Sequence, residues 1–212
     1  MNEAEICGKI CRTEENLSGG ATVFWAYDSS DDPDIIAELV RERCALLPYR
    51  LIAFPVDDWN ADLSPWRADG VFRGQDFAGK GAETLGWLKR AAVGCERPMI
   101  AGYSLAGLFA LWASCETELF SGAASCSGSV WYPGWSDYIK THSPNAEHVY
   151  LSLGDREEKT RNPVMAQVGD NTRALAEKLG IEVVWNEGNH FKDADKRLAA
   201  GIARLIESYV SA

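Results

Sequence analysis

The chain has 212 residues, of which 46% are hydrophobic and 25% charged, and its formal net charge is -10 at pH 7. This composition is typical of a folded globular protein and excludes a disordered, collagen-like or coiled-coil chain. An acidic surface repels phosphate groups, so neither nucleic acid nor an anionic membrane is expected as a partner. The length suits a well-filled core, and we expect one domain over residues 1–212.

The sequence gives no sign of a membrane span or a secretory leader. No stretch approaches the roughly 20 apolar residues that a spanning helix needs. The first twelve residues include Glu3, Glu5, Lys9 and Arg12, which do not form a basic start followed by an apolar run. A cytoplasmic location is therefore expected, provided that no leader precedes this sequence. The six cysteines are then expected as free thiols, and their spacing predicts neither a metal site nor a cofactor.

Strand-like and helix-like segments alternate along the chain. Predicted strands are 22–27, 49–56, 98–101, 120–126, 148–153 and 181–185. Predicted helices are 35–44, 81–93, 108–115, 163–179 and 193–210. Strands separated by helices of this length predict an α/β fold, with a mostly parallel sheet covered by helices on both faces.

The segment Gly102-Tyr-Ser-Leu-Ala-Gly107 lies between a predicted strand and a predicted helix. A nucleophile elbow places a serine on such a turn, with small residues two positions before and after it. Gly102 occupies the first position, and Ala106 stands in the second, where glycine is usual. The helix start would also direct backbone N–H groups toward an oxyanion. The segment predicts Ser104 as a nucleophile, and a serine in an ordinary strand-to-helix turn is the alternative.

Together with this turn, two more segments resemble those of α/β-hydrolases: Leu151-Ser-Leu-Gly-Asp-Arg-Glu-Glu158 and Trp185-Asn-Glu-Gly-Asn-His190. Within that superfamily the chain resembles the compact esterases related to esterase D and the enterochelin esterases, over residues 22–210. The resemblance implies an α/β-hydrolase fold, here without room for a large lid. It also implies a triad in the chain order serine, acid, histidine.

That order selects the base and narrows the choice of the acid. His190 follows the last predicted strand, where the base is expected, whereas His142 and His148 precede the loop that should carry the acid. That loop, after the predicted strand 148–153, offers three carboxylates. Related enzymes commonly place the acid three residues after a glycine, which selects Glu157, and Asp155 is the alternative. Either carboxylate could orient the imidazole.

The oxyanion hole and the substrate pocket are assigned from element order. The backbone N–H of Leu105, the residue after the nucleophile, is expected as one oxyanion donor. The second is expected from Tyr27 or Asp28, in the loop after the strand 22–27. Ligands in α/β sheets bind beyond the carboxyl ends of the strands. Four aromatic residues in such positions are candidates for the pocket, with core packing as the alternative: Trp59, Trp66, Trp131 and Tyr132.

The expected activity is that of a serine carboxylesterase, which would act on a small or medium ester through an acyl-enzyme and without a cofactor. The net charge makes a strongly anionic substrate less favourable. One alternative is a non-catalytic α/β-hydrolase-like protein that acts as a binding module. The other is a thioesterase or an acyltransferase on the same scaffold.

Overall fold

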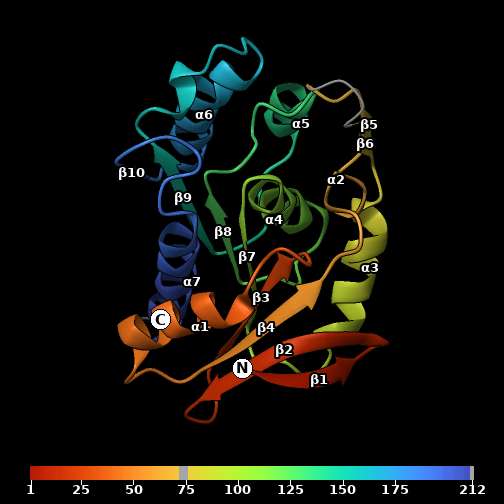
Figure 1. Ribbon diagram of the computed structural model, residues 1–212, viewed down its shortest axis with the longest axis vertical. Coiled ribbons are helices and arrows are strands. Elements are labelled where there is room, and N and C mark those ends of the chain that lie inside the picture. The colour runs from red at the N-terminus through yellow and green to blue at the C-terminus, as the bar shows by residue number, and fades with distance from the viewer. Residues whose placement is uncertain (72–75, 211–212) are drawn as a thin grey trace.

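The computed structural model describes residues 1–71 and 76–210. At its centre is an eight-stranded sheet with the strand order β1-β2-β4-β3-β7-β8-β9-β10 (Figure 1). Its strands are β1 (Asn2–Ile6), β2 (Lys9–Asn16), β3 (Ala21–Tyr27), β4 (Tyr49–Pro55), β7 (Pro98–Tyr103), β8 (Gly122–Cys126), β9 (His148–Gly154) and β10 (Val183–Asn186). All neighbours from β4 to β10 are parallel, whereas β2 runs antiparallel to β1 and to β4. The mostly parallel sheet expected from the sequence is therefore confirmed.

Helices cover both faces of this sheet, as expected. One face carries α1 (Pro33–Cys44) and α7 (Ala194–Val210), which also contact each other and lie side by side in Figure 1. The other face carries α3 (Gly81–Ala91), α4 (Leu105–Glu116), α5 (Trp135–Thr141) and α6 (Val168–Leu179). The remaining short elements are α2 (Trp59–Asp62), β5 (Arg67–Ala68), β6 (Phe77–Ala78) and the 3-10 turns η1 (Glu157–Lys159) and η2 (Met165–Gln167).

Side-chain alternation along the central strands builds a separate core on each face. In β3, Phe24 packs on the α3 and α4 side, and its neighbours Val23 and Trp25 pack on the α1 and α7 side. Ile52 and Leu51 of β4 divide in the same way. Successive residues of a strand point to opposite faces, so a strand that is apolar throughout is buried on both. Burying one such side chain contributes about 1.5–3 kcal/mol.

The helix that follows Ser104 is almost completely enclosed. All residues of α4 from Leu105 to Ser114 are buried. A helix that is apolar on every side is stable only inside a protein. Its burial anchors the turn before it, so Ser104 sits on a rigid base.

The hairpin β1–β2 is the main element that the sequence did not predict. Its turn consists of Cys7 and Gly8, both in the left-handed region, with φ of 48° and 82°. Two such residues form the tight turn that joins antiparallel strands. Polar residues occupy much of both strands, with Glu3 and Glu5 exposed, which hides the alternation of an ordinary strand. The sequence also did not predict the helices α2 and α5, the short strands β5 and β6 or the 3-10 turn η1, and several predicted elements begin or end a few residues away from the observed ones.

Candidate active site

The carboxyl ends of four parallel strands meet at one edge of the sheet and bring together segments that are distant in sequence. Tyr103 of β7 pairs with Cys126 of β8, and Cys126 pairs with Ser152 of β9. One step beyond β7, the Ser104 N–H donates to the Cys126 carbonyl at 3.1 Å. This edge therefore holds the residues that follow each strand, as expected for a ligand site in an α/β sheet.

Ser104 occupies a strained turn between β7 and α4. Its φ is 56° and its ψ is -122°, a conformation that L-residues rarely adopt and that is frequent at functional sites. The strand and helix come so close that a Cβ on Gly102 would lie 2.2 Å from the backbone of Ala106. Gly102 is thus required by the turn. The alanine at position 106 is itself buried without disturbing it.

Ser104, His190 and Glu157 form a continuous chain of hydrogen bonds, which we call the Ser–His–Glu array. His190 Nε2 lies 3.0 Å from Ser104 Oγ, and His190 Nδ1 lies 2.7 Å from Glu157 Oε2. A carboxylate beside Nδ1 keeps the hydrogen on that nitrogen, which leaves Nε2 free to accept the proton of the serine. The ring is therefore oriented to act as a base toward Ser104.

Glu157 is buried, and three groups bind its second oxygen. Glu157 Oε1 accepts from the Gly154 N–H at 2.7 Å, from Ser127 Oγ at 2.7 Å and from Arg197 Nη1 at 3.0 Å. Burial acts to raise the pKa of the Glu157 carboxyl, but hydrogen bonds from His190, Ser127 and Gly154 outweigh it and hold the pKa below its ordinary value. The carboxyl is thus ionised at neutral pH.

Asp155, the alternative acid, has a different place in the structure. Its Oδ1 accepts from the Gly188 N–H at 2.7 Å, and its own N–H donates to the Asn186 carbonyl at 2.8 Å. These bonds tie the turn after β9 to the loop that carries His190. The carboxylate in contact with the His190 ring is that of Glu157.

The backbone groups expected in the oxyanion hole lie around Ser104. Leu105 is the first residue of α4, where a backbone N–H has no acceptor within the helix. Tyr27 ends β3, and both Tyr27 and Asp28 line the same cavity as Ser104. The Asp28 N–H donates to Asp31 Oδ2 at 3.0 Å, so this donor is occupied by a carboxylate of its own loop.

The cavity beside Ser104 has a volume of about 500 Å³ and is markedly acidic. Trp59, predicted for the pocket, lines it. Its charged lining residues are Asp28, Asp31, Asp32 and Asp195. Burial raises the pKa of the Asp31 carboxyl, and the neighbouring charges of Asp28 and Asp195 raise it further.

A second cavity, of about 310 Å³, lies on the His190 side of the array. Trp131, like Trp59, was predicted for the substrate pocket. It lines this second cavity together with Met165, Val168 and Phe191. The Phe191 side chain follows His190 directly and is 87% exposed. Arg156 and Lys159 also line this cavity, so its charges are mostly opposite in sign to those beside Ser104.

The other two predicted pocket residues, Trp66 and Tyr132, pack against each other. Their ring centroids are 5.6 Å apart, and the Tyr132 hydroxyl donates to the Trp66 carbonyl. Trp66 Nε1 donates to the Pro133 carbonyl at 2.9 Å. Tyr132 is only 2% exposed. Their contacts are those of core residues, the alternative that the sequence left open.

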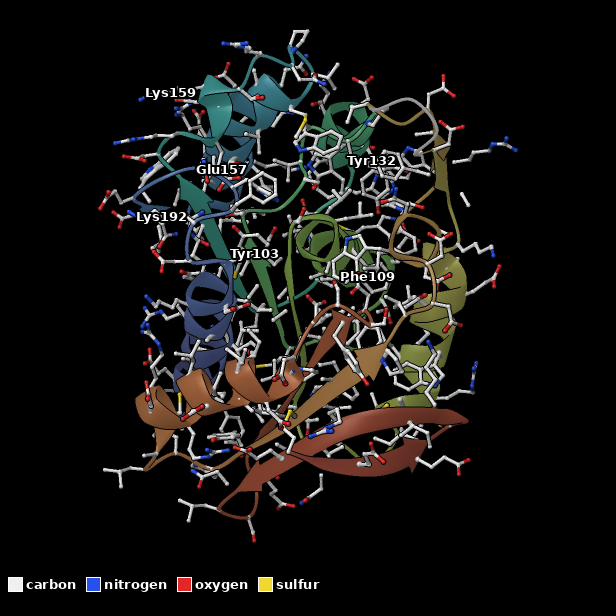
Figure 2. The ribbon with its side chains drawn as sticks, in the orientation of Figure 1. Tyr103, Phe109, Tyr132, Glu157, Lys159 and Lys192 are labelled. Carbon is white, nitrogen blue, oxygen red and sulfur yellow. The ribbon has the colours of Figure 1, made fainter. Side chains whose placement is uncertain are left out.

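Three residues around Glu157 and His190 were not identified from the sequence: Tyr103, Ser127 and Arg197. Arg197 offered a signal, because it stands four residues before Gly201 and eight before Leu205, on the buried face of α7. A charged residue at such a position is rarely solvated and needs a partner. Arg197 Nη1 contacts both the Tyr103 hydroxyl and Glu157 Oε1, and Figure 2 labels Glu157 above Tyr103.

Within residues 1–71 and 76–210, no group of three or more His, Cys, Asp or Glu side chains is arranged to hold a metal ion. In the same part of the chain, no helix is both long and apolar enough to cross a bilayer.

Comparison with known proteins adds a likeness in fold. No protein-family model matches the chain, and no curated protein matches it in sequence. Among solved structures, an IroE-like serine hydrolase from Shewanella oneidensis matches 94% of this chain and 76% of its own, with a TM-score of 0.73 and 15% identity. The enterobactin esterase FES from Shigella flexneri matches 94% of this chain at a TM-score of 0.66 and 15% identity.

This chain spans only 56% of the length of that enterobactin esterase. A CIB-like hydrolase from Thermoplasma acidophilum is similar over 99% of this chain and 96% of its own, with a TM-score of 0.61 and 12% identity. At such identities the shared property is the fold. The strand order, the turn at Ser104 and the similar solved structures all indicate the same fold. The protein has the α/β-hydrolase fold.

Proposed function

We propose that the protein is a serine hydrolase that cleaves carboxylic esters through an acyl-enzyme intermediate. The observation that carries this proposal is the Ser–His–Glu array, in which His190 lies within hydrogen-bond distance of both Ser104 and Glu157. The strained elbow at Ser104 and the fold shared with serine hydrolases and esterases support it.

The reaction has two halves. Ser104 Oγ attacks the ester carbonyl carbon while His190 Nε2 takes its proton, and the carbonyl oxygen becomes an oxyanion. The intermediate collapses, the bond to the alcohol breaks, and His190 gives the proton to the leaving alcohol. Water then attacks the acyl group on Ser104 with His190 again as the base. The carboxylic acid leaves, and the serine recovers its proton. Glu157 orients the ring and stabilises its cation.

The oxyanion would be bound by backbone donors. The Leu105 N–H, at the start of α4, is the first donor in this proposal. The second donor is the backbone N–H of Tyr27 or Asp28, which both line the cavity beside Ser104. For Asp28 to serve, the substrate must displace the Asp31 carboxylate from its N–H. One such donor stabilises the transition state by about 3 kcal/mol.

The cavities support a small or medium substrate. Their volumes, about 500 Å³ beside Ser104 and about 310 Å³ beside His190, lie near the lower part of the range for small-molecule sites. The intact hydrogen bonds of the array favour a hydrolase over a non-catalytic binding module. A thioester substrate, or an acyl acceptor other than water, would use the same acyl-enzyme.

The test is turnover of 4-nitrophenyl acetate and butyrate by the wild type and by Ser104→Ala. Loss of the nucleophile is expected to lower kcat/KM by about 10⁴-fold or more. Ser136→Ala, a change of the same kind at an exposed serine of α5, is expected to retain full activity. Equal rates for wild type and Ser104→Ala would refute the proposal.

A fluorophosphonate probe gives a second readout that does not depend on the choice of ester. The probe is expected to label Ser104 in the folded protein and to leave Ser104→Ala unlabelled. A binding module would not be labelled, whereas a thioesterase or acyltransferase would be. Comparing 4-nitrophenyl esters with matched thioesters, with and without an added alcohol, then separates those activities.

A further inference from the structure

We propose that Arg197 is a positioning residue for ester cleavage: by holding Glu157, it sets the orientation of His190 and the pH range in which His190 acts as a base. This inference rests on the proposed function of Ser104. Arg197 does not touch the reacting atoms, and its effect passes through Glu157 and Tyr103.

Arg197 contacts Glu157 and two residues near the Ser–His–Glu array. Its Nη1 lies 3.0 Å from Glu157 Oε1, 3.2 Å from Ser127 Oγ and 3.4 Å from the Tyr103 hydroxyl. Its Nη2 donates to the Glu187 carbonyl at 3.1 Å. The Arg197 and Glu157 side chains are 3% and 4% exposed, so this ion pair is shielded from water. At this burial the charge of Arg197 acts on Glu157 with little screening.

The two carboxylate oxygens of Glu157 have separate partners. Oε1 receives Arg197, Ser127 and the Gly154 N–H, while Oε2 faces His190 Nδ1. A carboxylate bound at one oxygen by three donors cannot rotate without breaking them. Glu157 therefore presents Oε2 to the His190 imidazole in one orientation.

A second route from Arg197 reaches the backbone of His190. The Tyr103 hydroxyl, which Arg197 Nη1 contacts, donates to the His190 carbonyl. The rings of Tyr103 and His190 also lie 5.2 Å apart between centroids. One guanidinium thus supports the histidine through both its side-chain partner and its main chain.

The end of β9 leaves room for this ion pair. A Cβ on Gly154 would lie 2.9 Å from Arg197 Nη1 and 2.9 Å from Glu157 Oε1, and 2.4 Å from the Gly188 carbonyl oxygen. These distances are closer than real Cβ contacts. The glycine lets the two charged side chains meet against the strand end and lets the loop that carries His190 pass over them.

The groups that face the pair determine the sign of the pH effect. The titratable side chains around Glu157 are His190, Tyr103 and Arg197, with Arg156 and Lys159 at the adjoining cavity. Asp193 and Cys126 lie within reach of the Arg197 charge. The other titratable side chains that line a cavity together with Arg197 are Arg43, Tyr150, Glu187, Lys192 and Lys196. Burial raises the pKa of the Tyr103 hydroxyl above its ordinary value and that of the Cys126 thiol to about 12, so both remain neutral at working pH.

Removing the positive charge of Arg197 makes the His190–Glu157 pair a stronger proton acceptor. The added proton inactivates the base whether it resides on the imidazole or on the carboxylate. The acidic limb of the kcat/KM profile must then move to higher pH. A lysine at position 197 keeps the charge but loses the planar fork that reaches several acceptors at once. The charge and the geometry can therefore be separated.

The experiment measures kcat/KM for 4-nitrophenyl butyrate from pH 5 to 9 in the wild type, Arg197→Met and Arg197→Lys. For Arg197→Met we expect the acidic limb to move up by about one pH unit or more, with a plateau about ten- to hundredfold lower. For Arg197→Lys we expect a lower plateau with the limb close to its wild-type position. Lys196→Gln removes a neighbouring charge that pairs with Asp193 on the surface, and it should match the wild type.

Rates are divided by the concentration of active sites titrated with a fluorophosphonate, so that unfolded protein does not contribute. If Arg197→Met does not fold, Arg197→Gln replaces it as the neutral variant. A limb that stays in place in the neutral variant, or that moves equally in Arg197→Lys, would overturn the proposal. Failure of the proposed function itself would instead appear as full activity in Ser104→Ala.

Discussion

The backbone conformation of Ser104 lowers the stability of the folded protein. A non-glycine residue with φ of 56° and ψ of -122° is strained, and such strain costs about 1–3 kcal/mol. The surrounding structure maintains it, because α4 is buried and Gly102 lets the strand and helix approach. In this conformation the Ser104 hydroxyl oxygen lies 3.0 Å from His190 Nε2.

Replacing Ser104 by glycine should therefore stabilise the protein relative to Ser104→Ala. Glycine adopts this backbone conformation without steric cost, although it loses more chain entropy on folding. We expect a net gain of about 1 kcal/mol, measured as unfolding free energy in urea. Ser136→Gly against Ser136→Ala, in an ordinary helical position of α5, should show the opposite order. Lower stability of Ser104→Gly than of Ser104→Ala would contradict the strain argument.

The Glu157 carboxyl should link folding to pH. Its pKa in the folded protein lies below its ordinary value, whereas the unfolded chain has a Glu pKa of about 4.3. The stabilisation from the ionised form is thus fully present above that pH. It is lost as the pH falls through the folded value, because the unfolded state takes up the proton first.

We therefore expect the unfolding free energy of the wild type to fall more steeply between pH 5 and pH 3 than that of Glu157→Gln. Urea titrations at several pH values measure this slope. Glu182→Gln, at an exposed position, should keep the wild-type slope. Parallel curves for the wild type and Glu157→Gln would show that Glu157 does not carry the linkage.

At the level of residues, only some of the site residues can be predicted from their order along the chain. The elbow motif and the chain order point to Ser104 and His190, which the structure brings to 3.0 Å from each other. Order along the chain does not distinguish Glu157 from Asp155, because that depends on which carboxylate the turn after β9 directs inward. Arg197 lies seven positions beyond His190 on another element, and only three-dimensional packing brings it to Glu157.

At the level of elements, periodicity predicts the buried parts well and the edge poorly. The central strands are apolar, and the helices α1, α3, α6 and α7 bury one apolar face each, so both kinds of element can be recognised from the spacing of their apolar residues. The hairpin β1–β2 lies at an end of the sheet (Figure 1), and every residue of its two strands except Cys11 is at least partly exposed, so polar residues replace apolar ones. Its turn depends on two residues with positive φ, and a cysteine in that role is not a turn signal.

The turn of the β1–β2 hairpin carries an exposed cysteine, Cys7, whose thiol can be modified chemically. Cys7 is the exposed cysteine, whereas Cys11, Cys44 and Cys126 are buried and Cys95 and Cys115 are partly buried. Burial raises the pKa of the thiols of Cys11 and Cys44 to about 11 and of Cys115 and Cys126 to about 12. A thiol reacts as its thiolate, so these four should react slowly in the folded protein.

We expect a disulfide reagent at pH 8 to modify Cys7 first, without changing the rate of 4-nitrophenyl butyrate cleavage expected under the proposed function, and to modify all six thiols in denaturant. Cys7→Ser should remove the fast phase. Cys95→Ser serves as the control and should retain the fast phase, because Cys95 is partly buried and its thiol donates to the Ala91 carbonyl. A fast phase that persists in Cys7→Ser would mean that the turn is not the accessible point.

At the level of the whole molecule, the charge is distributed unevenly around the array. The protein has a net charge of -10, and four aspartates line the cavity of about 500 Å³ beside Ser104. Arg156 and Lys159 line the cavity of about 310 Å³ beside His190. Ser104, which would carry the acyl group, lines the larger cavity, and His190, which would protonate the leaving alcohol, lines the smaller one. The acyl chain is therefore expected to enter the acidic cavity.

An acyl chain that ends in a carboxylate should be a poor substrate. The test compares three 4-nitrophenyl esters that share a leaving group and a similar chain length. Their acyl chains end in a neutral group, a carboxylate or a trimethylammonium group. Like charges a few ångströms apart repel by about 1 kcal/mol or more even when well solvated. We expect kcat/KM to be about tenfold lower for the anionic ester than for the neutral one at low salt, and highest for the cationic ester.

High salt and one substitution test whether charge repulsion in the acidic cavity slows cleavage of the anionic ester. In 1 M NaCl the Debye length falls to about 3 Å, so the differences among the three esters should narrow. Asp195→Asn removes one charge from the cavity wall without altering the array, and it should raise kcat/KM for the anionic ester while leaving the neutral one unchanged. If the anionic ester is cleaved as fast as the neutral ester at low salt, the acyl chain does not enter the acidic cavity. The charge of that cavity would then belong to the surface of the molecule rather than to its choice of substrate.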